Sequence, residues 1–206
     1  MKIKGFWHVY LINNWHSIVS RQMRTILNSG LYTACEEINI SLIGLPEERA
    51  ALEKFFSDVY PKLKIRCVSV EPTDYEFNAL RLIEKDNSEY IGFYFHTKGV
   101  TRPFEANIGQ WGLWLEEAIL NRWREHRMRV ENGYDVSSVN QMLSPDHFSG
   151  NFWWFNRKYI DRLPKVDSLD LTNRYHSEQW ICMCADRYVY AKEFIEPGRD
   201  PFIMDY

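Results

Sequence analysis

The sequence predicts an α/β fold in which a mostly parallel central sheet carries helices on both faces. Short apolar runs typical of buried strands alternate along the chain with longer segments whose apolar residues recur at helical spacing. Right-handed crossovers between such strands build a parallel sheet. The chain has 206 residues, 45% apolar and 26% charged, as in a globular domain with a sizeable core. No repeat, low-complexity segment or linker divides it, so we expect residues 1–206 to form a single domain.

The first half of the chain supplies most of the expected sheet. Residues 6–12 are continuously apolar apart from His8, which suits a central strand covered on both faces. Shorter apolar runs predict further strands at 38–43, 65–70 and 90–95. Apolar residues at helical spacing predict helices at 17–29, at 46–60 and after residue 73. Thr73-x-x-Glu76 matches a capping box, which predicts that these two residues open the third helix.

The second half continues the alternation with more irregular connections. The expected elements are a long helix at 108–129, a turn-rich stretch at 140–146, an aromatic strand at 152–155, a short helix at 158–163 and a last strand at 187–191. Ser177 is a suitable cap for a helix that starts at Glu178. The tail at 196–206 contains two prolines and a glycine, and we expect it to pack on the surface rather than to form a lid.

Charge and cysteine content exclude several classes of protein. Lys and Arg number 25 and Asp and Glu number 28, so the net charge of −3 gives no field for nucleic-acid binding. The basic segment at 121–129 reads as the solvated face of a helix, with a phosphate or peripheral membrane contact as the alternative. No segment approaches the roughly 20 apolar residues of a membrane span. The four cysteines lack zinc or redox spacing, which predicts reduced thiols in a cytoplasmic protein.

The segment His96-Thr97-Lys98-Gly99 closes the strand predicted at 90–95. Ligands of such sheets bind beyond the carboxyl ends of the strands. An imidazole, a hydroxyl and an ammonium offer hydrogen-bond donors and a cation to an anion, and Gly99 allows close backbone approach. Arg102 adds a second cation, so a diphosphate is the natural ligand. A simple turn after a strand is the alternative. The sequence contains no P-loop, dinucleotide fingerprint, nucleophile elbow or H-E-x-x-H motif.

A polar quartet, His147, Ser149, Gly150 and Asn151, directly precedes the aromatic strand. Its side chains can exchange hydrogen bonds with sugar hydroxyls, and Trp153 or Trp154 can offer a ring face to a sugar. The alternative is that His147 and Asn151 satisfy backbone groups at a bulge. The aromatic share of 16% fits either a bulky core or such platforms.

The segment 174–184 is a third candidate for chemistry. Tyr175, His176, Glu178 and Gln179 precede an apolar run. Glu178 can act as a base or orient a reacting sugar if it faces the cleft. It can equally serve only to complement the helix dipole.

These motifs together resemble a family. The ordered set YFHTKG, HFSGNFWWFNRKYIDRLP and Glu178-Gln-Trp-Ile is similar to glycosyltransferase-like proteins of bacteria and large viruses that have the GT-A architecture. The resemblance covers most of the chain, from residue 6 to about 190, and HFSGNFWW is its most specific piece. It implies a single Rossmann-like sheet and transfer of a sugar from a nucleotide-diphosphate sugar to a glycan or glycolipid acceptor. Surface polysaccharide synthesis is the implied context.

The resemblance also implies roles for individual residues. Asn13 and His16 would lie near the base or ribose, and His96 to Gly99 with Arg102 would bind the diphosphate. The aromatic strand, with the quartet and His176, would line the acceptor site. Glu178 would stand near the reacting sugar carbon, and Asp146 is a less favoured candidate base.

The sequence departs from the family at one point. The usual D-x-D motif, which holds Mn²⁺ or Mg²⁺ on the diphosphate, is replaced by His96-Thr97-Lys98. Lys98 and Arg102 replace the charge of the metal, or a metal binds through other ligands, or donor chemistry has been lost. The last alternative describes a non-catalytic nucleotide- or carbohydrate-binding module on the same fold.

Overall fold

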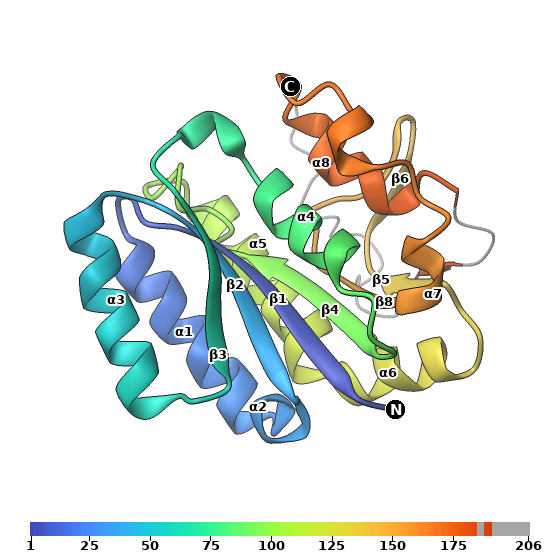
Figure 1. The fold of residues 1–206 in the computed structure, drawn as a ribbon, viewed down its shortest axis with the longest axis horizontal. Helices are drawn as coiled ribbons and strands as arrows, with labels where there is room; N and C mark the ends of the chain where they lie inside the picture. Colours follow the sequence, from blue (N-terminus) through green and yellow to red (C-terminus); the bar gives the residue numbers. More distant parts are fainter. Residues whose placement is uncertain (185–187, 191–206) are drawn as a thin grey trace.

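Most strands of the described residues assemble into one twisted sheet with helices on either side (Figure 1). The computed structural model describes residues 1–184 and 188–190. Within them the sheet has seven strands in the order β3-β2-β1-β4-β8-β5-β9. The strands are β1 (Ile3–Tyr10), β2 (Glu37–Ile43), β3 (Leu63–Ser69), β4 (Ile91–His96), β5 (Val136–Ser138), β8 (Trp153–Asn156) and β9 (Tyr188–Tyr190). Only β8 runs against its neighbours, so the predicted mostly parallel sheet is confirmed.

Helices cover both faces of the sheet, as predicted. The helices are α1 (Trp15–Asn28), α2 (Leu31–Ala34), α3 (Pro46–Val59), α4 (Phe77–Lys85), α5 (Ala106–Leu115), α6 (Trp123–Glu131), α7 (Arg157–Ile160) and α8 (Tyr175–Gln179). Residues of α1, α3, α5 and α6 share one buried apolar cluster with the sheet. Residues of α4 and α7 form a second cluster on the other face. The two clusters are the two halves of the core.

Successive residues of the inner strands point into opposite clusters. In β1, Trp7 belongs to the first cluster and Phe6 to the second. In β8, Trp154 belongs to the first and Trp153 to the second. This alternation is the period of two that a strand imposes on its side chains. Full burial of one such large apolar side chain contributes about 1.5 to 3 kcal/mol.

Two local predictions were wrong, and a third was incomplete. The capping box does not form, because α4 begins at Phe77 and the helix has no side-chain cap. The single helix expected at 108–129 is interrupted by a π-helical segment at Glu116–Asn121, where the buried ring of His126 bonds the Ala118 carbonyl. The turn-rich stretch at 140–146 lies in a hairpin of β6 (Gln141–Leu143) and β7 (Asp146–Phe148). Each error arises where a tertiary contact or strand pairing outweighs the local pattern.

Two further predictions concern the C-terminal part. Ser177 lies inside α8 instead of capping it, since its hydroxyl donates to the Arg174 carbonyl over 2.7 Å. The last strand was expected at 187–191, and Tyr188–Tyr190 pairs with β5 as β9. The tail at 196–206 lies outside the described residues.

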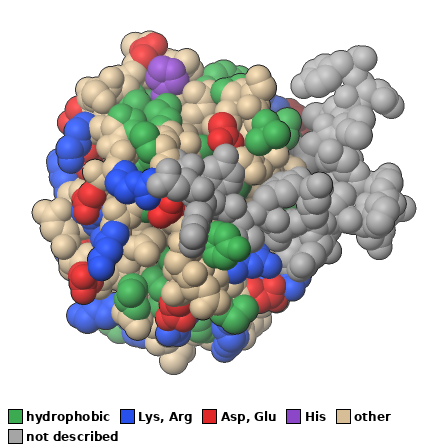
Figure 2. Space-filling view, turned by 90° about the vertical axis from the view of Figure 1, so that its right-hand side faces the viewer, with side chains coloured by type: hydrophobic (Ala, Val, Ile, Leu, Met, Phe, Trp, Pro, Cys, Tyr) green, Lys and Arg blue, Asp and Glu red, His purple; other side chains and the backbone are tan. Residues whose placement is uncertain are grey.

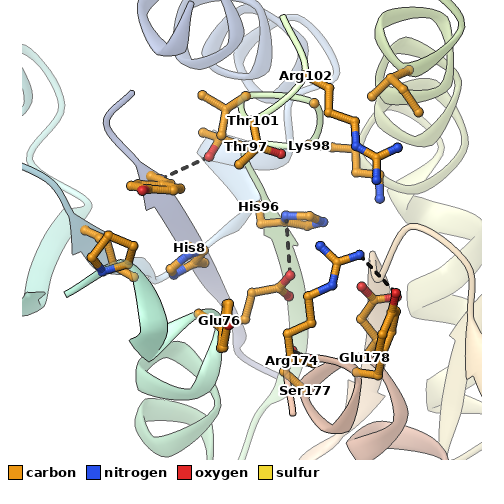
Figure 3. A pocket seen from close by; sticks show the side chains of 18 of the residues that line it. His8, Glu76, His96, Thr97, Lys98, Thr101, Arg102, Arg174, Ser177 and Glu178 are labelled. Atoms are coloured by element: carbon orange, nitrogen blue, oxygen red, sulfur yellow. Dashed lines mark hydrogen bonds and ion pairs between the residues drawn. The ribbon is translucent and has the colours of Figure 1, made fainter. Parts of the chain in front are cut away.

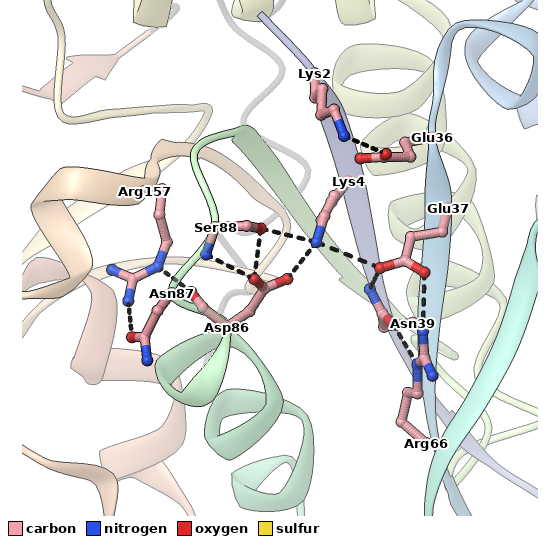
Figure 4. A network of polar contacts seen from close by, with 10 residues as sticks. All are labelled: Lys2, Lys4, Glu36, Glu37, Asn39, Arg66, Asp86, Asn87, Ser88 and Arg157. Atoms are coloured by element: carbon pink, nitrogen blue, oxygen red, sulfur yellow. Dashed lines mark hydrogen bonds and ion pairs between the residues drawn. The ribbon is translucent and has the colours of Figure 1, made fainter.

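A network of polar side chains joins the amino ends of three neighbouring strands (Figure 4). Lys4 on β1 forms ion pairs with Asp86 over 2.7 Å and with Glu37 on β2 over 3.4 Å. Arg66 on β3 also contacts Glu37, over 2.9 Å. Although their partial burial opposes ionisation, the pKa values of both carboxyl groups are lowered because hydrogen bonds and cations surround them. At this end of the sheet the charges are matched within the chain.

Candidate functional site

A cavity of about 380 Å³ lies at the opposite end of the sheet, beyond the carboxyl ends of β1, β2 and β4 (Figure 3). Its walls come from these strand ends, from the segment that follows β4, from the residues just before α4, from α5 and from α8. Parallel strands that end together bring residues from distant parts of the sequence to one edge. The cavity is therefore where the sequence predicted that a ligand would bind.

The residues predicted to hold a diphosphate lie on one wall of this cavity. They are His96, Thr97, Lys98, Gly99 and Arg102. The Thr97 hydroxyl accepts a hydrogen bond from the Tyr10 amide over 3.0 Å, which ties the turn to β1. Gly99 has a φ of +89°, a conformation that residues with a side chain rarely adopt. The backbone thus fixes the direction in which the turn presents its side chains.

Lys98 is a cation on this wall. Its Nζ lies 3.9 Å from the centre of the Trp111 ring. No ion pair joins it to a carboxylate of the described residues. Burial lowers the pKa of Lys98, although the carboxylates of Glu178 and Glu76 oppose this shift. A cavity wall that holds an ammonium group without a paired anion is suited to binding an anion.

Glu178 and Arg174 face this wall from α8 and the residue before it (Figure 3). The Arg174 guanidinium lies over the Tyr175 ring, 4.8 Å from its centre, and donates to the Tyr175 hydroxyl over 3.4 Å. The Glu178 carboxylate has no hydrogen bond or ion pair with any residue that the structure describes, so it stays available to a ligand. The sequence predicted a role for Glu178 and overlooked Arg174.

Glu76 is the most important cavity residue that the sequence analysis missed. It was interpreted as part of a capping box, but its Oε2 accepts hydrogen bonds from the Tyr94 hydroxyl over 2.5 Å and from Asn151 Nδ2 over 2.6 Å. Its Oε1 lies 3.7 Å from His96 Nδ1. Tyr75, directly before it, has φ 43° and ψ −135°, which is strained backbone for a residue with a side chain. The position of Glu76 after β3, at the carboxyl edge, was the available signal.

Two buried imidazoles stand beside Glu76. His8 on β1 and His96 on β4 are partners in the parallel register, so they lie side by side. Burial lowers the pKa of each to about 4, which leaves both rings neutral at pH 7. His96 Nε2 lies 2.9 Å from the Gly150 carbonyl, whereas neither nitrogen of His8 has a hydrogen-bond partner among the described residues. His8, like Glu76, was not among the predicted site residues.

The quartet before the aromatic strand contacts residues that line the cavity. Gly150 and Asn151 contact His96 and Glu76, as described above, but no member of the quartet lines the cavity. Asn151 is only 1% exposed, and its Oδ1 accepts from Trp153 Nε1 over 2.7 Å. The His147 ring bonds the Pro145 carbonyl, and the Ser149 backbone amide donates to the Asn140 carbonyl. The backbone-satisfying alternative therefore holds for His147, whereas the side chain of Asn151 bonds Glu76 and Trp153.

The prediction that Trp153 or Trp154 offers a face to a sugar was wrong. Both side chains are 0% exposed. Trp153 stacks on Tyr94 with ring centres 4.7 Å apart, and Trp154 stacks on Phe93 at 4.9 Å. An isolated aromatic strand cannot reveal from its sequence that both of its faces will be covered. The aromatic residues here belong to the core.

The remaining predicted site residues do not line the cavity. Asn13 Nδ2 donates to the Val100 carbonyl over 2.9 Å and so braces the segment after β4. His16 is exposed and stacks on Trp15. Asp146 accepts from Gln141 within the hairpin, and the geometry gives no support to a role as base. His176 is half-buried in α8, away from the cavity lining.

The end of β4 does not offer the ligands that a divalent metal requires. His96 Nε2 and the Thr97 hydroxyl already engage backbone groups, and Lys98 is a cation. In the described residues, no group of three or more His, Cys, Asp or Glu side chains is arranged to hold a metal ion. The side chains present therefore do not fit the Mn²⁺ or Mg²⁺ that the resemblance implies.

Two further properties of the molecule concern its possible binding partners. Figure 2 shows basic and acidic side chains interspersed on the face that it presents, without a broad area of one sign. None of the helices in the described ranges is both long enough and apolar enough to cross a membrane.

Comparison with known proteins supports the fold. No family model matches the chain, and no curated protein matches it. Among solved structures, it is similar to 4-diphosphocytidyl-2C-methyl-D-erythritol synthase from Anaerococcus prevotii DSM 20548, with a TM-score of 0.50. The match covers 94% of this chain and 90% of that chain at 9% identity. The mixed α/β, Rossmann-like fold class is therefore confirmed, and at this identity the likeness concerns the fold alone.

Proposed function

We propose that the protein is a glycosyltransferase. It binds a nucleotide-diphosphate sugar in the cavity and passes the sugar to a hydroxyl group of a glycan or glycolipid acceptor. The observation that carries this proposal is Lys98, an ammonium group on the cavity wall at the end of β4 with no ion-pair partner in the described residues. The solved structure named above is called a synthase of a diphosphocytidyl compound, and this use of a related fold agrees with a nucleotide ligand.

The cavity residues can meet the electrostatic demand of glycosyl transfer. Cleavage of the glycosidic bond leaves negative charge on the diphosphate, and Lys98, Arg102 and Arg174 would stabilise it. Lys98 and Arg102 thus supply positive charge where the class usually places a metal. Precise placement of the acceptor hydroxyl beside the sugar carbon further increases the rate of transfer.

Glu178 is the base in this proposal. Its carboxylate is not engaged by other described side chains and faces the same cavity. It would take the proton from the acceptor hydroxyl as the new bond forms. We propose further that the protein acts in the cytoplasm in surface polysaccharide synthesis. A peripheral contact with the membrane would give it access to a glycolipid acceptor.

Thermal unfolding with nucleoside diphosphates tests the ligand class. UDP, GDP, ADP and CDP are compared, and at least one should raise the Tm of the wild type. Lys98→Ala should abolish that increase. Lys64→Ala is the control, because it removes an exposed cation of β3 that does not line the cavity. This variant should retain the increase in Tm. An equal increase in the Lys98→Ala protein would contradict the role of Lys98.

A second candidate function is a non-catalytic nucleotide- or carbohydrate-binding module. The lack of metal ligands at the end of β4 favours it. Slow hydrolysis of UDP-, GDP- and ADP-sugars, with and without Mn²⁺, separates the two. Turnover by the wild type that is lost in Glu178→Gln supports the transferase. Equal binding by both proteins without turnover by either supports the module.

A further inference from the structure

Two hydrogen-bond acceptors face each other at the inner end of the cavity without a donor between them. They are Glu76 Oε1 and His96 Nδ1, which lie 3.7 Å apart. That distance is too long for a direct hydrogen bond. Both side chains line the cavity, and they are 14% and 13% exposed. Figure 3 shows His96 between Glu76 on one side and Lys98 with Arg102 on the other.

The contacts of His96 determine which of its nitrogens is the acceptor. Nε2 lies 2.9 Å from the Gly150 carbonyl, and a carbonyl oxygen can only accept, so Nε2 carries the hydrogen. The neutral ring therefore presents an unprotonated Nδ1 toward Glu76. Burial, with Lys98 nearby, disfavours the charged ring that would pair directly with the carboxylate.

Glu76 is held so that its other oxygen faces the cavity. Its Oε2 already accepts from the Tyr94 hydroxyl and from Asn151 Nδ2. Asn151 is itself buried and fixed by Trp153. These contacts, with the strained backbone of Tyr75, leave Oε1 as the oxygen that a ligand can reach.

A third polar group without a partner stands next to this pair. His8 is 4% exposed, lines the cavity beside His96, and makes no hydrogen bond with any described residue. A buried polar group without a partner costs free energy that a ligand can recover. The three side chains thus form one subsite, which we define as Glu76, His96 and His8.

We propose that this subsite binds two neighbouring hydroxyl groups of a sugar ring, which donate hydrogen bonds to Glu76 Oε1 and His96 Nδ1. The inference rests on the proposed function, because it assigns the inner end of the cavity to the sugar or ribose ring and the Lys98 wall to phosphate. The Glu76 carboxylate disfavours an anion at the subsite, and Lys98 disfavours a cation. Neutral donors satisfy both constraints.

Nitrogen NMR of the full chain with labelled histidine tests the subsite directly. The His96 signals are assigned from their loss in His96→Gln. D-ribose and D-glucose are titrated, each against its 2-deoxy and 3-deoxy counterparts, which between them break every pair of neighbouring ring hydroxyls. At least one of the two sugars should move the Nδ1 signal toward that of a hydrogen-bonded nitrogen. At least one deoxy counterpart of that sugar should bind at least about tenfold more weakly.

Glu76→Gln removes one of the two acceptors while it preserves the shape of the side chain. The amide oxygen can still accept from Tyr94 and Asn151, while the amide nitrogen takes the place of Oε1 and can only donate. A sugar hydroxyl that would donate to Oε1 then meets a donor, so neither sugar should move the Nδ1 signal. Glu178→Gln removes the same charge from the opposite wall and should retain the movement caused by sugar.

The outcomes separate this inference from the proposed function. Inorganic pyrophosphate is titrated in the same samples to probe the Lys98 wall. If pyrophosphate binds while neither sugar moves the His96 signal up to its solubility limit, the subsite is refuted and the proposed function stands. If a sugar acts as described while pyrophosphate does not bind, the subsite stands and the proposed binding of phosphate at Lys98 is refuted. A sugar response that persists in Glu76→Gln also refutes the subsite.

Discussion

Asn151 Nδ2 donates a hydrogen bond to Glu76 Oε2 over 2.6 Å and thereby joins residues 75 positions apart in the sequence. Asn151 has a φ of 54°, a left-handed conformation that asparagine tolerates better than most residues. Its own oxygen accepts from Trp153, so both ends of the amide are bonded within the protein. The polar quartet thus contributes to the cavity by positioning a carboxylate.

Asn151→Asp should destabilise the protein at neutral pH. Aspartate has nearly the same size and conformational tolerance, but it places a second carboxylate against Glu76 in a buried site. We expect a loss of at least about 2 kcal/mol in the free energy of unfolding, measured in urea. The loss should shrink on acidification, as one of the two groups takes a proton. Asn121→Asp is the control, because Asn121 donates to Glu117 at an exposed site and should cost little.

The affinity for pyrophosphate should fall as the pH rises, and it should do so below the pH range in which an ordinary lysine titrates. The pKa of Lys98 is lowered in the ligand-free protein, so its ammonium loses a proton at a lower pH than an ordinary lysine. An anion binds the protonated form, hence affinity declines as pH passes through this lowered pKa. Calorimetry at increasing pH measures the decline. The Lys98→Arg protein keeps its positive charge, so its affinity should change with pH only through the ionisation of pyrophosphate itself. Identical pH profiles of affinity for the wild type and Lys98→Arg would contradict the role of Lys98.

Stability should decrease on mild acidification because of the buried histidines. His8 and His96 have folded pKa values of about 4, below the ordinary value of 6.5. Between these values the unfolded chain binds more protons, so stability is lost as pH falls from about 6.5 toward 4. Each histidine accounts for about 3 kcal/mol over that whole range. Urea unfolding between pH 6.5 and 5, before most carboxylates titrate, should show the slope. His8→Gln should reduce it, and an unchanged slope would contradict the low pKa of His8.

Two glycine substitutions should have opposite effects. An added Cβ at Gly150 would lie 2.4 Å from Leu115 Cδ1, and the residue has a φ of +91°. Gly150→Ala should therefore lower the free energy of unfolding by at least about 2 kcal/mol. Gly109 lies in α5 with open space around its Cβ position, so Gly109→Ala should stabilise the protein by about 0.5 to 1 kcal/mol. Thermal unfolding of the two variants checks both signs.

The sequence was most informative where a local pattern has one structural meaning. Apolar runs that alternate with helical periodicity predicted the sheet and its two helical layers. The rule that ligands bind beyond the carboxyl ends of the strands led to the segment of Lys98, which lines the cavity. These two inferences needed no knowledge of long-range packing, whereas the position of Glu178 in the same cavity was expected only from the family resemblance.

The sequence misled where one pattern fits two structures. Thr73-x-x-Glu76 has the spacing of a helix cap, and only the contact with Asn151 shows that Glu76 turns into the cavity instead. Trp153 and Trp154 could have been ligand platforms, but burial on both faces of a central strand is a property of the assembled sheet. Partners far apart in the chain determined both outcomes.

The two ends of the sheet differ in how freely they can change. The network around Lys4 fastens the amino ends of the strands with charges that find each other inside the molecule. At the cavity end, Lys98 and Glu178 have no ion-pair partner among the described residues, whereas Asn151 and Glu76 are bonded to each other. Substitution of the two unpaired side chains can therefore change which ligand binds while the framework of the sheet is retained.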